Sequence, residues 1–182
     1  MPTDWVARSA HDIAELIIAT NPQLLAHRAE GKRAVNQVGE QTKRQLRWAA
    51  TLLDKSMGGR PFWTRTRADI VDLDKWFERL PTMTGKSPRH REASCTLEMI
   101  EAEALTRIDN GELSVDDLGF TTPNTNKHFR FLSQIDKFAV KHIPGLTLVG
   151  FNEFCTPDLK DEREARQRIS VDQATAIFGL PP

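Results

Sequence analysis

The chain has 182 residues, with 25 Lys and Arg against 25 Asp and Glu, a length sufficient for one domain with a hydrophobic core. No apolar run approaches the roughly 18 residues that cross a bilayer, and no basic start precedes an apolar block, so we expect a cytoplasmic protein without membrane span or secretory signal. Cys95 and Cys155 lie far apart without a CxxC pair or a Cys/His cluster, which indicates buried or idle thiols and neither metal site nor cofactor.

The zero net charge hides a segregation of charge along the sequence. Residues 32–67 carry nine basic side chains against two acidic ones, and residues 98–117 carry seven acidic side chains against one basic. Residues 122–142 are again basic, with a net charge of +3. Because the local field attracts a polyanion more than the total charge does, we expect an electropositive face on a neutral protein.

Helical periodicity begins near the N-terminus. Apolar residues recur at spacings of three and four over residues 9–20, which predicts a helix that Asn21-Pro22 ends. A second short helix is predicted over residues 22–30, and a polar linker follows it. The first 37 residues are therefore either an arm that contacts a partner or a helix packed on the domain that follows.

Two helices with clear ends come next. The first is predicted over residues 40–57 and ends at Gly58-Gly59. At the start of the second, Thr66 and Asp69 form a variant of the capping box, and Pro81 stops the helix. The apolar residues of both helices recur at the spacing of a face that packs on a core.

Loops and helical turns alternate in the middle of the chain. A loop with the basic tip GKSPRHR precedes a helix that Ser94 or Thr96 caps and Asn110-Gly111 ends. Residues 113–118 predict one further helical turn. Only LTLVGF, residues 146–151, has the composition of a strand.

The longest predicted helix, residues 121–142, has two chemically different faces. One is apolar and wide enough to pack on a core. The other is basic or amide-bearing and comprises Lys127, Arg130, Gln134, Lys137 and Lys141. The only acidic residue, Asp136, lies off this stripe, whereas His128 falls among the apolar residues and is expected to cap or pack. The basic face favours contact with DNA phosphates, with Asn126, Arg130 and Gln134 in reach of base edges; the alternative is an ordinary solvated face.

Further candidate phosphate contacts lie on the helix over residues 40–57, at the next helix start and in the loop after it. A helix start offers free backbone N–H groups and a favourable dipole to an anion. For each group the alternative is a side chain that only keeps the protein soluble or, at the helix start, only caps it. These candidates are Lys43, Arg44, Arg47, Arg65, Thr66, Arg67, Lys86, Arg89 and Arg91.

Four segments form an ordered series: TKRQLRWAATLLDKSMGGRP (residues 42–61), TRADIVDLDKWFERLP (66–81), NKHFRFLSQIDKFA (126–139) and EREARQRISVDQATAIF (162–178). Together they resemble the N-terminal half of tyrosine recombinases of the phage integrase type. The first three are similar to helices of that family's core-binding domain, and the second, with Thr-x-x-Asp-Ile at its start and Leu-Pro at its end, is the closest match. The fourth resembles the linker and first helix of the catalytic domain.

The resemblance implies an all-α fold, namely a small orthogonal helical bundle of the SAM-like core-binding type with an extra N-terminal helical segment. It divides the chain into an N-terminal helical arm (1–37), a core-binding domain (38–151) and a linker with the first helix of a missing catalytic domain (152–182). The family's catalytic residues, including its tyrosine nucleophile, belong to that catalytic domain. Because this chain contains no tyrosine, we expect it to have no catalytic residue and no enzymatic activity on its own.

The resemblance further implies a partner and a role. The partner is double-stranded DNA, which the chain would clamp for integration or recombination by the catalytic domain, in assemblies with other protomers on DNA. Two alternatives from other classes stay open. One is a stand-alone helical DNA-binding regulator, which would need a compact helix-turn-helix pair, and the other is a helical protein–protein adaptor with incidental basic stripes.

Overall fold

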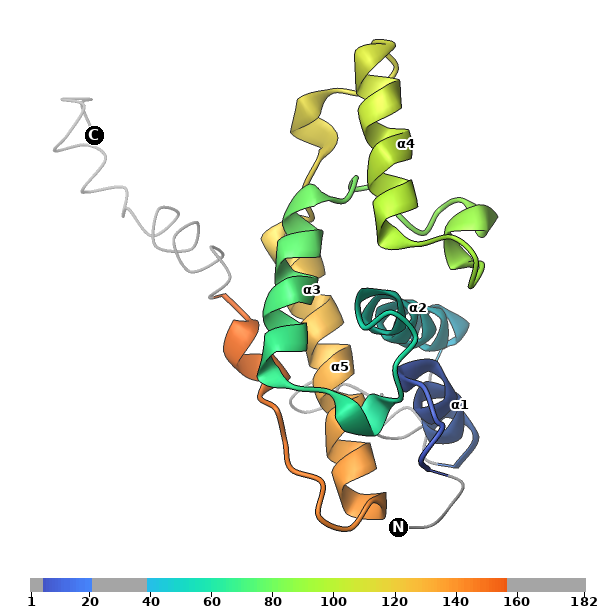
Figure 1. Cartoon of the computed structure of the whole chain (residues 1–182), viewed down its shortest axis with the longest axis vertical. Coiled ribbons are helices and arrows are strands. Elements are labelled where there is room, and N and C mark those ends of the chain that lie inside the picture. The colour runs from blue at the N-terminus through green and yellow to red at the C-terminus, as the bar shows by residue number, and fades with distance from the viewer. Residues whose placement is uncertain (1–4, 21–38, 157–182) are drawn as a thin grey trace, which may run out of the picture.

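Five α-helices form the described part of the chain, residues 5–20 and 39–156, in the computed structural model (Figure 1). They are α1 Ala10–Thr20, α2 Glu40–Ser56, α3 Arg67–Arg79, α4 Leu97–Asp109 and α5 Thr122–His142. Four short 3₁₀ turns join them: η2 Phe62–Thr64, η3 Pro88–Arg91, η4 Val115–Asp117 and η5 Phe151–Phe154. The predicted all-α fold is confirmed. The segments predicted as helical at 22–30 and 162–178 lie outside the described residues.

Strand pairing is confined to one isolated bridge, between Pro81 and Leu118, within the described ranges. Residues 146–150, despite their strand-like composition, run irregularly into η5. No helix in the part of the chain that the structure describes has the length and apolar character to cross a membrane.

Helix boundaries follow the local chemistry of the sequence. At the start of α3 the Asp69 carboxylate accepts hydrogen bonds from the Thr66 backbone N–H at 2.7 Å and from its hydroxyl at 2.8 Å, within the predicted capping box. Of the two caps considered for α4, the structure uses Thr96, whose hydroxyl accepts from the Met99 N–H at 3.3 Å. The predicted turn after residue 113 forms as η4.

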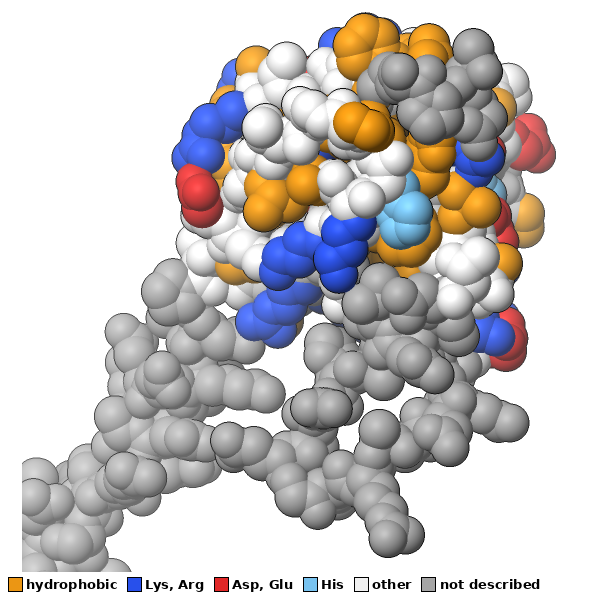
Figure 2. All heavy atoms as spheres, turned by 90° about the horizontal axis from the view of Figure 1, so that it is seen from below, with side chains coloured by type: hydrophobic (Ala, Val, Ile, Leu, Met, Phe, Trp, Pro, Cys, Tyr) orange, Lys and Arg blue, Asp and Glu red, His pale blue; other side chains and the backbone are white. Residues whose placement is uncertain are grey.

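The acidic segment and the basic helix α5 extend toward different ends of the molecule. α4 and η4, which carry the acidic segment, lie toward the upper end of the molecule in Figure 1, whereas α5 finishes at the opposite end. Figure 2 views the molecule from that lower end and shows Lys and Arg side chains gathered beside hydrophobic ones, with acidic side chains toward the margins of the described surface. The helix that the sequence marked as basic therefore ends on a face that is rich in cations.

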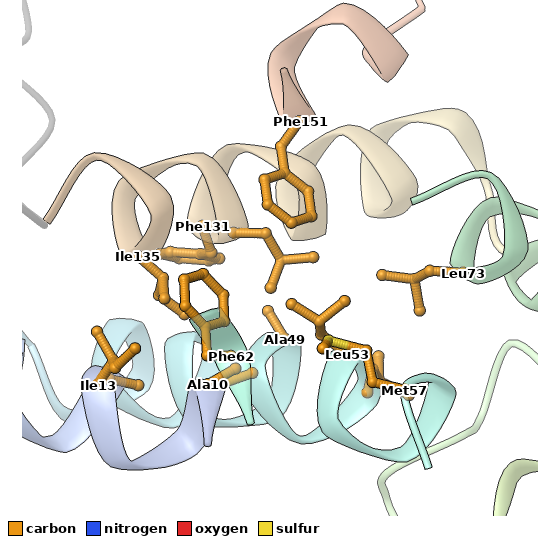
Figure 3. Packing of buried hydrophobic residues seen from close by; sticks show 14 of the residues in the cluster. Ala10, Ile13, Ala49, Leu53, Met57, Phe62, Leu73, Phe131, Ile135 and Phe151 are labelled. Atoms are coloured by element: carbon orange, nitrogen blue, oxygen red, sulfur yellow. The ribbon is translucent and has the colours of Figure 1, made fainter. Parts of the chain in front are cut away.

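The hydrophobic core lies between α5 and a layer formed by α1 and α2, with α3 closing it on a further side (Figures 1 and 3). In Figure 3 the side chains of Ile13, Ala49 and Ile135, one from each of the three helices, lie around the ring of Phe62. All three are fully buried. Because α1 contributes to the same core as α2 and α5, the described part of the N-terminal segment is a helix packed on the domain.

A buried ion pair ties α5 to the chain that precedes α3. The Arg65 guanidinium donates to the Asp136 carboxylate through Nε at 2.7 Å and through Nη2, and Nη2 also donates to the Thr147 carbonyl at 2.9 Å. The second carboxylate oxygen of Asp136 accepts the Val149 backbone N–H at 3.0 Å. The two charged side chains are only 1% and 2% exposed. This network joins three segments that are far apart in the sequence.

Candidate nucleic-acid interface

Ion pairs divide the predicted basic contacts into two groups. Five of these side chains have a carboxylate partner: Lys43 (Glu40), Arg47 (Glu15), Arg65 (Asp136), Arg67 (Glu153) and Arg89 (Glu103). The other seven have none among the ion pairs of the described chain, and we call these seven the basic surface: Arg44, Lys86, Arg91, Lys127, Arg130, Lys137 and Lys141. Basic side chains without a carboxylate partner keep their positive charge available to attract a polyanion.

Four members of the basic surface meet in a groove of about 280 Å³ between the first half of α2, the loop after α3 and the first turns of α5. They are Arg44, Lys86, Arg91 and Lys127. Arg91 is held there by hydrogen bonds from its Nε and Nη2 to the Gly85 carbonyl, at 3.1 and 2.9 Å. The fold thus brings together three segments that are separate in the sequence.

The other three members continue from the groove along α5. Arg130, Lys137 and Lys141 follow Lys127 at the spacing of one helix face, and all three are exposed. Gln134 lies on the same face but is only half-buried, and its Oε1 is shielded from solvent without a hydrogen-bond partner. Groove and stripe form one continuous surface because they share Lys127.

Few acidic groups reduce the positive electrostatic potential of the basic surface. No Asp or Glu is among the described residues that line the groove. The only acidic residue of α5, Asp136, is buried and neutralised by Arg65. Like charges that are close together repel one another, so an anion bound at the basic surface relieves repulsion as well as gaining attraction.

Two of the predicted DNA contacts are buried and have partners within the protein. Arg65 is 5% exposed, and its guanidinium forms an ion pair with Asp136 instead of contacting a phosphate. Asn126 is 1% exposed, and its amide holds the backbone of Thr156, donating through Nδ2 at 2.7 Å and accepting through Oδ1 at 3.0 Å. Asn126 is buried because the segment after α5 folds back along the helix and covers this side of its first turns.

The remaining candidates stay at the surface but lie outside the groove. Lys43, Arg67 and Arg89 keep the carboxylate partners named above, and the Arg47 guanidinium, hydrogen-bonded to Glu15, holds the pKa of that carboxyl below its usual value. Thr66 is exposed and serves as the helix cap. None of these residues lines the groove.

His128 packs among aromatic rings, in agreement with the prediction that it is not a primary DNA contact. Its ring lies 5.4 Å from that of Phe77 and 5.5 Å from that of Phe120, measured between centroids. Burial, with a smaller contribution from the neighbouring Lys127 charge, lowers the pKa of His128 to about 4. The imidazole is therefore neutral at pH 7.

We expect the free energy of unfolding to fall as the pH drops from about 6.5 to about 4. In this range the unfolded chain protonates His128, whose ordinary pKa is 6.5, while the folded chain keeps it neutral at its lowered pKa. His128→Phe should remove this part of the pH dependence. Urea unfolding of both proteins at several pH values measures it, with the difference at pH 7.5 giving the packing effect alone. A difference between the proteins that stays constant with pH would contradict the assignment.

Comparison of the chain with protein-family models, with curated proteins and with solved structures gives no match. The interface is therefore defined by its geometry and charge. Sequence reasoning missed the polar groups that line the groove beside its cations, which are Gln41, Gln45, Thr84 and Asn124. They come from three separate segments, and no local pattern in the sequence connects them.

Proposed function

We propose that this chain binds double-stranded DNA through the basic surface, as the core-binding portion of an integrase-type tyrosine recombinase. In this role it forms one half of a clamp around the duplex. The catalytic domain forms the other half and carries out strand cleavage, in assemblies of protomers on DNA. The observation that carries DNA binding is the grouping of the seven basic side chains without a carboxylate partner on one continuous surface. The recombinase assignment rests on the resemblance of the four segments.

The dimensions of the basic surface suit a duplex. From Lys127 to Lys141 the helix rises by roughly 21 Å at 1.5 Å per residue, which corresponds to about six base-pair steps of 3.4 Å. A helix about 10–12 Å across also fits the major groove, which is about 12 Å wide. Because the opposite side of α5 is packed in the core, its basic face is the side that meets the DNA.

A regulator of the helix-turn-helix class is the less favoured alternative. Such proteins join two helices by a turn of roughly three or four residues. In the continuous range 39–156, the chains that connect α2 to α3, α3 to α4 and α4 to α5 are all longer than that. A reading frame that continues past residue 182 into a domain with a tyrosine nucleophile would support the recombinase role, and continuation into an unrelated domain would contradict it.

Binding to a duplex of arbitrary sequence should be strong at 50 mM salt and much weaker at 200 mM. If most of the seven cations reach phosphates, the affinity should fall by about 10³-fold or more over this range, because each contact releases condensed counterions. Fluorescence anisotropy of a labelled duplex measures it. No binding at 50 mM salt, or an affinity that is independent of salt, would rule out this mode of DNA binding.

A further inference from the structure

The groove combines its cations with aromatic and amide side chains. Beside its four cations it is lined by the rings of Trp48, Phe120 and Phe131 and by three side-chain amides, those of Gln41, Gln45 and Asn124. Aromatic rings stack on nucleobases, and amides form paired hydrogen bonds with base edges. The three rings also pack in or against the hydrophobic core, where Phe131 is 4% exposed, so a base would meet only the parts of them that line the groove.

The positive charge of the groove favours the binding of an anion. Arg44 and Lys127 have no ion-pair partner among the described residues, and Lys86 has only the Met83 sulfur, 2.8 Å from its Nζ. No carboxylate lines the groove in these ranges. Cations that surround a small hollow without an acid repel one another, and an anion within the hollow removes that repulsion.

Two buried polar atoms at the groove lack partners. The Thr84 hydroxyl and Nδ1 of His128 are both shielded from solvent without a hydrogen bond, and both residues line the groove. Thr84 is 8% exposed. Because neither atom is open to the groove itself, they mark polar side chains packed beneath its wall, and neither is a contact for a ligand.

The loop at the groove is held firmly in place. Gly85 has φ +87°, which favours glycine, and a Cβ at this position would lie 2.5 Å from the Trp48 ring. The backbone that bears Lys86 therefore lies directly against the indole of α2. The His90 ring fixes the same turn by accepting the Gly85 N–H at 3.2 Å. The loop backbone, the Trp48 ring and the Arg91 side chain are thus positioned before any ligand arrives.

We propose that the groove binds one nucleotide, with its phosphate between Arg44, Lys86 and Lys127 and its base against the aromatic lining. A volume of about 280 Å³ lies just below the usual range of ligand sites, about 300–1,000 Å³, so the groove has room for no more than one nucleotide. In the DNA-bound protein this nucleotide is an unstacked one of the duplex, and in this respect the inference rests on the proposed function. A free mononucleotide offers the same chemistry.

Calorimetric titration of the whole chain distinguishes a nucleotide site from a phosphate site. The probes are 2′-deoxyadenosine 5′-monophosphate (dAMP), inorganic phosphate, deoxyribose 5-phosphate and deoxyadenosine. We expect dAMP to bind at least about tenfold more tightly than any of the three fragments, because only dAMP engages both rings and cations. Equal affinity for dAMP and inorganic phosphate would overturn the inference.

Paired variants locate the site. Arg44→Ala combined with Lys86→Ala should weaken dAMP binding by about tenfold or more. Lys137→Ala combined with Lys141→Ala removes the same charge from the basic surface outside the groove and should leave dAMP binding within about twofold of the wild type. An equal loss in both double variants would show general charge attraction and would overturn the inference.

A duplex with a one-nucleotide bulge identifies the source of the nucleotide. If the source is DNA, the bulged duplex should bind more tightly than a perfect duplex, and dAMP should compete for that gain. If the source is a free nucleotide, dAMP binds but the bulge adds nothing. If the protein binds the perfect duplex but binds dAMP no more tightly than phosphate, the nucleotide site in the groove is refuted and the proposed function is not. Binding of dAMP without any duplex binding would refute the proposed function instead.

Discussion

Replacing Asp136 by Ala should lower the free energy of unfolding by about 3–5 kcal/mol. The change leaves the Arg65 guanidinium buried without its counter-charge and leaves the Val149 N–H without its acceptor. An uncompensated charge in a buried site is among the most destabilising single changes known. Since domains of this size have about 5–15 kcal/mol of stability in all, the variant should unfold at a much lower urea concentration.

Arg67 provides the matched control. Its ion pair with Glu153 spans 2.6 Å, but the two side chains are 60% and 62% exposed. Such surface pairs contribute less than about 1 kcal/mol, so Arg67→Ala should shift the urea midpoint only slightly. Equal shifts for the two variants would mean that the pair between Arg65 and Asp136 does not hold the three segments together.

Removing three cations of the basic surface should change the salt dependence of DNA binding. We combine three substitutions in one variant: Lys127→Ala, Arg130→Ala and Lys137→Ala. In this variant the slope of log affinity against log salt concentration should become shallower by about 2.7, which is about 0.9 for each lost phosphate contact. Affinity at low salt should fall with it. Anisotropy titrations of a labelled duplex from 50 to 200 mM salt give both quantities.

The control for this variant removes the same amount of charge from ion-paired positions. Lys43, Arg67 and Arg89 already have carboxylate partners, so their combined replacement by Ala should leave the slope nearly unchanged. This outcome distinguishes a defined surface from a general effect of net charge. If the two triple variants lose the same slope, the division into paired and unpaired cations has no functional meaning.

The helices were predictable because their signals are local. A predicted helix over residues 121–142 became α5, Thr122–His142, and the capping box of Thr66 and Asp69 formed as expected. Apolar periodicity and caps act within a few residues, so one sequence contains them fully. The stripe along α5 was predictable for the same reason, since helical spacing alone aligns Lys127 with Lys141.

What the sequence left undetermined depends on distant contacts. Asn126 lies at the edge of the basic face by helical spacing, but the returning chain at Thr156 covers it. Arg65 directly precedes the cap of α3, where a phosphate contact was reasonable, yet the turn η2 directs it at Asp136. The groove likewise exists only because α2, the loop after α3 and α5 meet. Residue spacing within one segment does not predict contacts between segments that are far apart in the sequence.

The central claim is that DNA lies along the basic surface, and mapping backbone amide chemical shifts on adding a duplex at low salt tests it most directly. The largest changes should fall on the first half of α2, on residues 82–91 and on α5 from Lys127 to Lys141. α4, which carries acidic residues and lines none of the groove, should change much less. Changes that concentrate on α4, or that spare α5, would contradict the account.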